Sequence, residues 1–202
     1  MKNLDKLSAK LCSNIGVKRY EHTLRVVDYA GYLAQVYDLD VEQAKLATLL
    51  HDCGREIGLQ DSVSYLRRHG QKINKTESLQ PILLHARIGR LIAEHKYAVT
   101  DKQILQAIEY HTTGNKDMDS LAMLVYVADM LEPERAFPGV EQLRSLVGQV
   151  SLPNLMLACL RSTLEHLLSA GLLIHTDSIK TYNSLVNMLK KENSSKLRGV
   201  SL

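Results

Sequence analysis

The chain has 202 residues, of which 45% are hydrophobic and 23% charged, a balance that suits one globular domain and excludes a disordered chain. The formal charge is only +3 and aromatic residues make up 5%, so the sequence lacks the basic, aromatic-rich composition of a nucleic-acid-binding protein. No apolar run reaches the roughly 18 residues that a membrane span needs.

The cysteines and the first residues of the chain indicate the compartment. Cys12, Cys53 and Cys159 lie far apart and form no CxxC pair, so neither a disulfide framework nor a zinc ribbon is expected. Residues 1–16 carry several charges and have no apolar stretch of the kind found in a signal peptide. We therefore expect a cytoplasmic protein that binds neither nucleic acid nor a membrane.

Helical periodicity runs along nearly the whole chain, with apolar residues recurring at steps of three and four. Alternating strand patterns are nearly absent, which predicts one all-α domain of about nine or ten helices over residues 1–192, with 193–202 as a frayed tail. The expected helices cover residues 4–15, 22–37, 41–52, 61–70, 82–97, 101–111, 121–132, 140–147, 153–170 and 177–192, and Glu132 with Pro133 marks the end of the seventh.

Several helix boundaries follow from capping residues. Asp40 followed by Gln43 resembles a capping box, and Asp61 and Asp101 stand where a helix N-cap is expected. The polar stretch 70–77 between two periodic segments is predicted to be a loop.

Six polar residues occupy helix faces that are otherwise apolar. Taken singly, each could be a hydrogen-bonded core histidine or a capping aspartate, but together, on five helices, they indicate a shared site. Imidazole and carboxylate are ligands for Fe, Mn, Co, Ni or Zn rather than for Ca. The six residues are His22, His51, Asp52, His85, His111 and Asp129.

The order H…HD…D in these residues resembles the HD-domain metal phosphohydrolases. Within them, the surrounding segments resemble the YqeK family of symmetrical bis(5′-nucleosyl)-tetraphosphatases over about residues 15–190. The segments are RYEHTLRV (19–26), LLHDCGRE (49–56), LLHARIG (83–89), IEYHTTG (108–114), VYVADMLEPERAFPGV (125–140) and LLIHTDSIKTYN (172–183).

The resemblance implies an enzyme that splits diadenosine tetraphosphate into two ADP. It also implies that iron is held by His22, His51, Asp52 and Asp129, whereas the residue types alone suit Mn, Co, Ni or Zn equally. We expect one metal. The alternative is a second metal on His85 and His111 with Asp52 as a bridge.

The expected catalytic roles follow from phosphoanhydride hydrolysis. Asp52 would hold the metal and orient or deprotonate the attacking water, while His85 and His111 would contact phosphate oxygens or protonate the leaving ADP. Arg55, which stands where many HD proteins have lysine, joins Asp52, His85 and His111 in the expected catalytic set.

The expected substrate contacts extend beyond this catalytic set. Arg19 and Arg135 would balance phosphate charge, Thr112 would bond a phosphate, and the segment after the predicted helix 153–170 would face the nucleoside. A structural helix C-cap explains Gly171 and Leu172 equally well, and the alternative role of Thr112 is to terminate the helix after His111. The full set is Arg19, His22, Asp52, Arg55, His85, His111, Thr112, Asp129, Arg135, Gly171, Leu172, Leu173, Ile174, His175 and Thr176.

Two other functions share part of this pattern. Another HD phosphohydrolase, such as a nucleotidase or a deoxynucleotide triphosphohydrolase, would use the same ligands. A non-catalytic nucleotide-binding module would be expected to lose at least one of them, and all are present. The resemblance further implies a small-molecule nucleotide as partner and suggests a homodimer.

Overall fold

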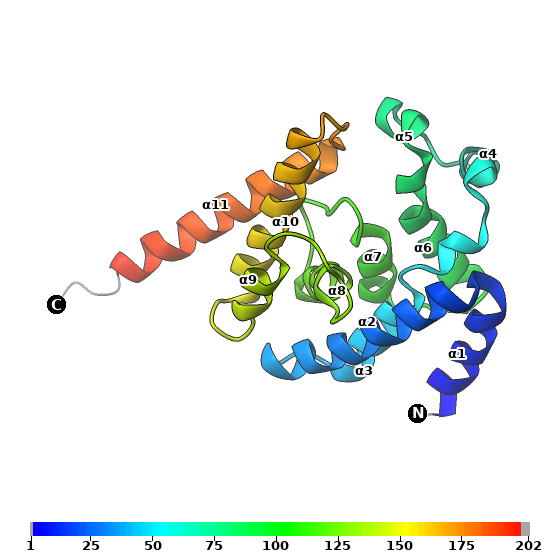
Figure 1. The fold of residues 1–202 in the computed structure, drawn as a ribbon, viewed down its shortest axis with the longest axis horizontal. Helices are drawn as coiled ribbons and strands as arrows, with labels where there is room; N and C mark the ends of the chain where they lie inside the picture. Colours follow the sequence, from blue (N-terminus) through cyan, green and yellow to red (C-terminus); the bar gives the residue numbers. More distant parts are fainter. Residues whose placement is uncertain (1, 199–202) are drawn as a thin grey trace.

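The computed structural model describes the backbone of residues 2–198, and within that range it contains helices and loops but no strand (Figure 1). None of the described helices combines the length and the apolarity that crossing a bilayer requires. The α-helices are α1 (Lys2–Ile15), α2 (Val17–Val36), α3 (Val41–Leu50), α4 (Ser62–Arg68), α5 (Lys75–Leu79), α6 (His85–His95), α7 (Lys102–Tyr110), α8 (Ser120–Leu131), α9 (Val140–Ser145), α10 (Leu152–Ser169) and α11 (Thr176–Arg198).

Helix α8 forms the centre of the fold. Every residue from 121 to 128 is buried, so this helix is apolar on all sides, as a helix enclosed by other helices must be. It packs against α2, α3, α7 and α10, and α11 covers α10 from outside (Figure 1). Asp129 therefore reaches the middle of the molecule on the last turn of its most buried helix.

The caps explain where several helices begin and end. The carboxylate of Asp40 accepts a hydrogen bond from the amide of Gln43 at 2.8 Å, and Asp101 caps α7 in the same way, as predicted. Asp61 precedes α4, but its side chain makes no capping hydrogen bond. After α10, Gly171 has a φ of +63° and donates to Leu168, which completes a helix C-cap.

Some predicted boundaries were wrong. The eleven described α-helices slightly exceed the predicted nine or ten. The stretch 70–77 is not entirely a loop, because Asn74 and Glu77 form a capping box that starts α5. The predicted helix 82–97 begins instead as a 3₁₀ turn, and α6 starts at His85. Helix α11 continues to Arg198, and residues 199–202 of the expected tail lie outside the described residues.

Gly54 allows the chain after α3 to lie directly against α6. A Cβ atom at this position would stand 2.0 Å from the carbonyl oxygen of His85 and 2.5 Å from the amide nitrogen of Gly89. Both neighbours are backbone atoms, so no side-chain rotation can relieve the overlap. The absence of a side chain at Gly54 is therefore what brings His51 and Asp52 close to His85.

We expect Gly54→Ala to lower the free energy of unfolding by about 3 kcal/mol or more, because α6 must shift to admit one methyl group. Urea unfolding monitored by circular dichroism measures this change. Gly58→Ala is the matched control, since a Cβ there meets only the flexible side chain of Gln60 and φ is −56°. Equal stability of the two variants would contradict this account of the packing.

Candidate metal centre and active site

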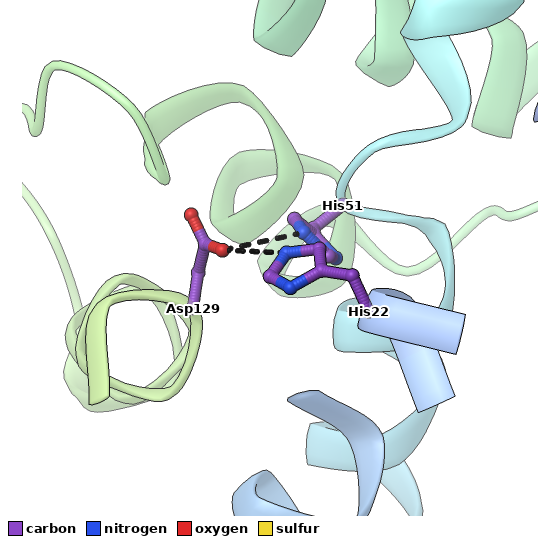
Figure 2. Close-up of side chains that lie close together, drawn as sticks. All are labelled: His22, His51 and Asp129. Carbon is purple, nitrogen blue, oxygen red and sulfur yellow. Dashed lines mark hydrogen bonds and ion pairs between the residues drawn. The ribbon is translucent and has the colours of Figure 1, made fainter. Parts of the chain in front are cut away.

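Three side chains from three helices converge on one point beside α8 (Figure 2). His22 comes from α2, His51 from the end of α3 and Asp129 from α8. The Nε2 atom of His22 lies 2.9 Å from Oδ1 of Asp129, and the Nε2 atom of His51 lies 3.8 Å from the same oxygen. One ligand atom from each residue lies within 4.8 Å of the other two, a spacing at which one metal ion can be held.

Asp52 lies at the side of this group, facing two further histidines. Its Oδ2 is 3.7 Å from Nε2 of His51, and its Oδ1 is 3.3 Å from Nε2 of His85 and 3.8 Å from that of His111. His51, Asp52 and His111 form a second set whose atoms could hold a metal. Asp52 thus stands between the two sets of histidines.

Three of the histidines are oriented by the same backbone contact. The Nδ1 atoms of His51, His85 and His111 lie 2.5, 2.6 and 2.8 Å from the carbonyl oxygens three residues earlier in the chain. A carbonyl oxygen can only accept a hydrogen bond, so Nδ1 carries the proton in each ring. The neutral rings therefore all present the lone pair of Nε2 to the shared site.

The Nε2 atom of His51 is the clearest sign that the site takes a cation. Its side chain has no exposed surface, and among the described residues nothing forms a hydrogen bond with this atom. A buried polar atom without a partner costs about 1–3 kcal/mol, a cost that a bound ion removes. His22 and Asp129 complete an imidazole and carboxylate set that suits a transition metal.

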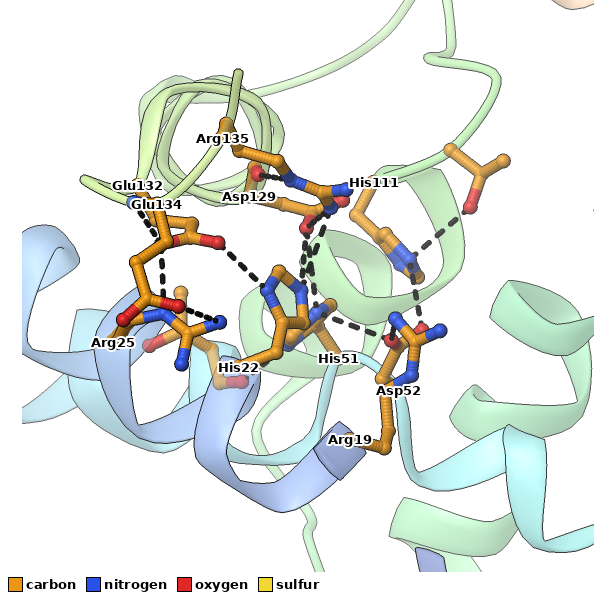
Figure 3. Close-up of polar contacts among 12 residues, drawn as sticks. Arg19, His22, Arg25, His51, Asp52, His111, Asp129, Glu132, Glu134 and Arg135 are labelled. Carbon is orange, nitrogen blue, oxygen red and sulfur yellow. Dashed lines mark hydrogen bonds and ion pairs between the residues drawn. The ribbon is translucent and has the colours of Figure 1, made fainter. Parts of the chain in front are cut away.

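Glu132 and Arg25 support this centre and were not predicted from the sequence. The Nδ1 atom of His22 lies 3.1 Å from Oε1 of Glu132, and Arg25 donates to the other carboxylate oxygen at 3.0 Å (Figure 3). The contact turns Nε2 of His22 toward Asp129. The sequence marks Glu132 only as the end of a helix before Pro133, although its position three residues after Asp129 indicates the same helix face.

We expect Glu132→Gln to weaken metal binding by roughly 10- to 100-fold, because a neutral amide holds the His22 ring less firmly and makes it a poorer ligand. Competition with a chromophoric chelator measures the affinity. Glu134→Gln is the control, since Glu134 also pairs with Arg25 but its side chain is 68% exposed and does not touch His22. Unchanged affinity in the Glu132 variant would refute this supporting role.

His85 and His111 form a pair whose Nε2 atoms are 3.1 Å apart. Arg55 lies with Nη2 3.2 Å from Nε2 of His85 and can donate to it. The hydroxyl of Thr112 lies 3.1 Å from Nε2 of both histidines and can donate to His111. Both lone pairs therefore have a protein donor, in contrast to that of His51.

Burial and charge set the protonation states of these groups. Burial lowers the pKa of His85 to about 4 and that of His111 to about 3, so both rings are neutral at pH 7. Burial alone would raise the pKa values of Asp52 and Asp129. The surrounding histidines and arginines outweigh it and hold both pKa values below the ordinary value, so the carboxylates stay ionised.

The lowered pKa values of His85 and His111 predict that the metal-free protein loses stability as the pH falls. In the unfolded chain a histidine takes up its proton near pH 6.5, but folded His85 and His111 do so only near pH 4 and 3. The unfolded state thus binds more protons between these values, and lowering the pH from 7 to 5 should remove roughly 3 kcal/mol of stability for the pair. Urea unfolding of chelator-treated protein at both pH values measures the loss.

The double variant His85→Gln/His111→Gln should lose most of that pH dependence. The matched control is His69→Gln/His95→Gln, since both of these histidines are exposed and lie outside the site. If the two double variants keep the same pH dependence, the buried pair is not its source.

Three arginines surround the two carboxylates. Arg55 binds Oδ1 of Asp52 at 2.7 Å. Arg19 binds the opposite oxygen of Asp52 at 3.0 Å, and Arg135 binds Oδ1 of Asp129 at 2.5 Å (Figure 3). A cavity of about 240 Å³ opens beside them. The predicted site residues that line it are Arg55, His85, His111, Thr112, Asp129 and Arg135.

The segment 171–176 lies apart from this cavity. Gly171 and Leu172 form the C-cap of α10, the structural alternative considered above, and Leu172 and Leu173 are each 46% exposed. His175 is buried and lines a separate cavity of about 260 Å³, where its Nε2 lies 2.9 Å from the side-chain nitrogen Nδ2 of Asn74. No residue of the segment lines the cavity beside the histidine pair and Asp129.

The HD domain family matches residues 19–134, the part of the chain that carries His22, His51, Asp52 and Asp129. Proteins with this domain that act as hydrolases depend on a metal, and the His and Asp groups described above could hold one. The site is thus that of an HD-domain metallohydrolase.

Comparison with similar proteins shows which family of HD-domain hydrolases this chain resembles. The chain is 31% identical to a symmetrical bis(5′-nucleosyl)-tetraphosphatase of Staphylococcus aureus over 90% of this chain and 93% of that one, and 33% identical to its counterpart in Halalkalibacterium halodurans over 83% and 89%. A crystal structure of a predicted HD superfamily hydrolase involved in NAD metabolism, from Clostridium acetobutylicum, superposes with a TM-score of 0.86 at 33% identity and covers 91% of this chain and 97% of that one. The chain belongs to the HD-domain family of symmetrical bis(5′-nucleosyl)-tetraphosphatases.

Proposed function

We propose that this protein hydrolyses diadenosine tetraphosphate to two ADP with a metal ion held beside α8. The observation that carries the metal-dependent chemistry is the orphaned Nε2 of His51, aimed at His22 and Asp129. The relatives named as symmetrical bis(5′-nucleosyl)-tetraphosphatases support the substrate and the position of cleavage. Three arginines around the site supply the positive charge that a chain of four phosphates requires.

The metal would be one iron ion held by His22, His51, Asp52 and Asp129. When bound, it would polarise the phosphoryl group and lower the pKa of the attacking water. One metal rather than two is supported by the histidine pair, because Arg55 and Thr112 already donate to the Nε2 atoms of His85 and His111. Mn, Co, Ni or Zn remain possible substitutes on the donor set alone.

The chain's own residues then orient and neutralise the substrate. Asp52 lies between the other proposed metal ligands and the histidine pair, where its carboxylate would orient the attacking water. In His85 and His111 the Nδ1–H group donates a hydrogen bond to a backbone carbonyl. Nε2 is therefore the atom at which each ring would exchange a proton with the phosphate chain. Arg55 and Arg135 face the same cavity and would donate to phosphate oxygens.

The nucleoside contacts are proposed on the family resemblance. Thr112 faces the cavity beside the histidine pair. The start of α11, directly after the segment 171–176, contacts the neighbouring residue, since Ser178 donates to the carbonyl of Thr113 at 2.9 Å. The segment would meet the nucleoside of a substrate whose phosphates occupy the cavity. A homodimer and the absence of a nucleic-acid partner stay predictions.

Product analysis tests the function. We expect the metal-loaded protein to convert diadenosine tetraphosphate to ADP alone, measured by ion-exchange chromatography. AMP with ATP would overturn the symmetrical cleavage. An unreacted substrate with metal bound would favour another nucleotide hydrolase, and the absence of bound metal in any condition would favour a regulatory module.

Asp129→Ala should abolish both metal binding and turnover, because it removes the carboxylate shared by His22 and His51 while the helices remain. Metal content by mass spectrometry, turnover and circular dichroism together test this.

His111→Ala should keep the metal and slow the reaction. Loss of a second equivalent of metal from the His111 variant would instead support the two-metal alternative.

A further inference from the structure

A second opening reaches the metal ligands from the side opposite the histidine pair. This groove measures about 690 Å³ and runs between the start of α2 and the stretch after α8. It is lined by His22, whereas the smaller cavity is lined by Asp129, and Arg135 borders both. The candidate metal centre therefore lies between two cavities and is open to each.

The groove is richer in positive than in negative side chains. Two carboxylates line it, Glu132 and Glu134, and both are bound to Arg25. The other three cations that line it are Lys18, Arg19 and Arg135. Arg19 and Arg135 lean toward the carboxylates of the centre and remain more than a third exposed.

Lys18 differs from the other cations because its charge is free. Among the described residues, no carboxylate pairs with it, and it is exposed. Lys18, His22 and Arg25 are spaced by four and three residues, so they form one stripe along α2 (Figure 3 shows the last two). Lys18 thus lies one helical turn from a metal ligand, on the face that lines the groove.

The symmetry of the proposed substrate requires two binding regions. Cleavage at the centre of diadenosine tetraphosphate leaves one nucleoside diphosphate on each side of the attacked bond. The cavity of about 240 Å³ beside the histidine pair has the groups to receive one half. The groove supplies what the other half needs, a free cation for its phosphates and apolar surface at Ile15 and Val17 for its nucleoside.

We propose that this groove is the subsite for the second nucleoside diphosphate half of the substrate and that Lys18 binds its phosphates. The proposal rests on the proposed function, since only a substrate with two nucleoside ends needs both cavities. Lys18 is a binding residue here and takes no part in bond cleavage.

The test compares Lys18→Glu and Lys18→Ala with wild type and with Lys102→Glu, in the metal-loaded full chain. Lys102 is also exposed and lies at the far end of α7 from His111, so its variant makes the same charge change away from both cavities. We expect Lys18→Glu to raise the KM for diadenosine tetraphosphate roughly tenfold, with kcat little changed and Lys18→Ala intermediate. Lys102→Glu should match wild type.

ADP and a photoreactive substrate separate this subsite from the rest of the site. The inhibition constant of ADP, which would bind first beside the histidine pair, should change much less in Lys18→Glu than the KM does. An 8-azidoadenosine analogue of diadenosine tetraphosphate should label residues 15–19 in wild type, as mapped by peptide mass spectrometry.

The experiment distinguishes a failure of the proposed subsite from a failure of the proposed function. If wild type forms ADP from diadenosine tetraphosphate but Lys18→Glu has the KM of Lys102→Glu and residues 15–19 are not labelled, the subsite is wrong and the proposed function stands. If wild type does not hydrolyse the substrate at all, the proposed function fails and the subsite fails with it.

Discussion

The site depends on one repeated hydrogen bond, from the Nδ1–H of a histidine to the carbonyl oxygen three residues earlier. It occurs at the end of α3, at the start of α6 and at the end of α7. In each place the helix geometry fixes the ring and its tautomer together, so the Nε2 lone pair faces inward, and only that of His51 lacks a protein donor. Because the side chains are short and the helices are rigid, the position of each lone pair is set by the packing of helices. The arrangement of these lone pairs is therefore a property of the fold rather than of a flexible loop.

Close packing at α6 then determines how near the two groups of histidines lie. Gly54 lets the turn after α3 touch the backbone of α6, and this contact places Asp52 between His51 and His85. The carboxylate can serve both groups only because the separation is small. Burial would favour a protonated Asp52, and the surrounding histidines and arginines overcome that effect.

Much of this arrangement could be predicted from the sequence, and the exceptions have physical reasons. Helical periodicity and inward-facing polar residues indicated the all-α fold and the six polar residues that the structure brings together. The contact between His22 and Glu132 spans 110 positions, so it depends on how α2 meets α8 and no local pattern encodes it. The short helix α5 was missed because its capping box lies in a polar stretch with little apolar periodicity.

The arginines have a double role that follows from charge balance. Arg19 and Arg55 each bind one oxygen of Asp52, and Arg135 binds the oxygen of Asp129 that faces His22. Those same oxygens are the ones that a metal would need, so a bound cation must compete with the guanidinium groups for them. A metal ion bound to these oxygens would displace the guanidinium groups and leave the three arginines without a negatively charged partner. A bound polyphosphate would supply that charge, so in the proposed function the metal and the substrate would favour each other's binding through the same three side chains.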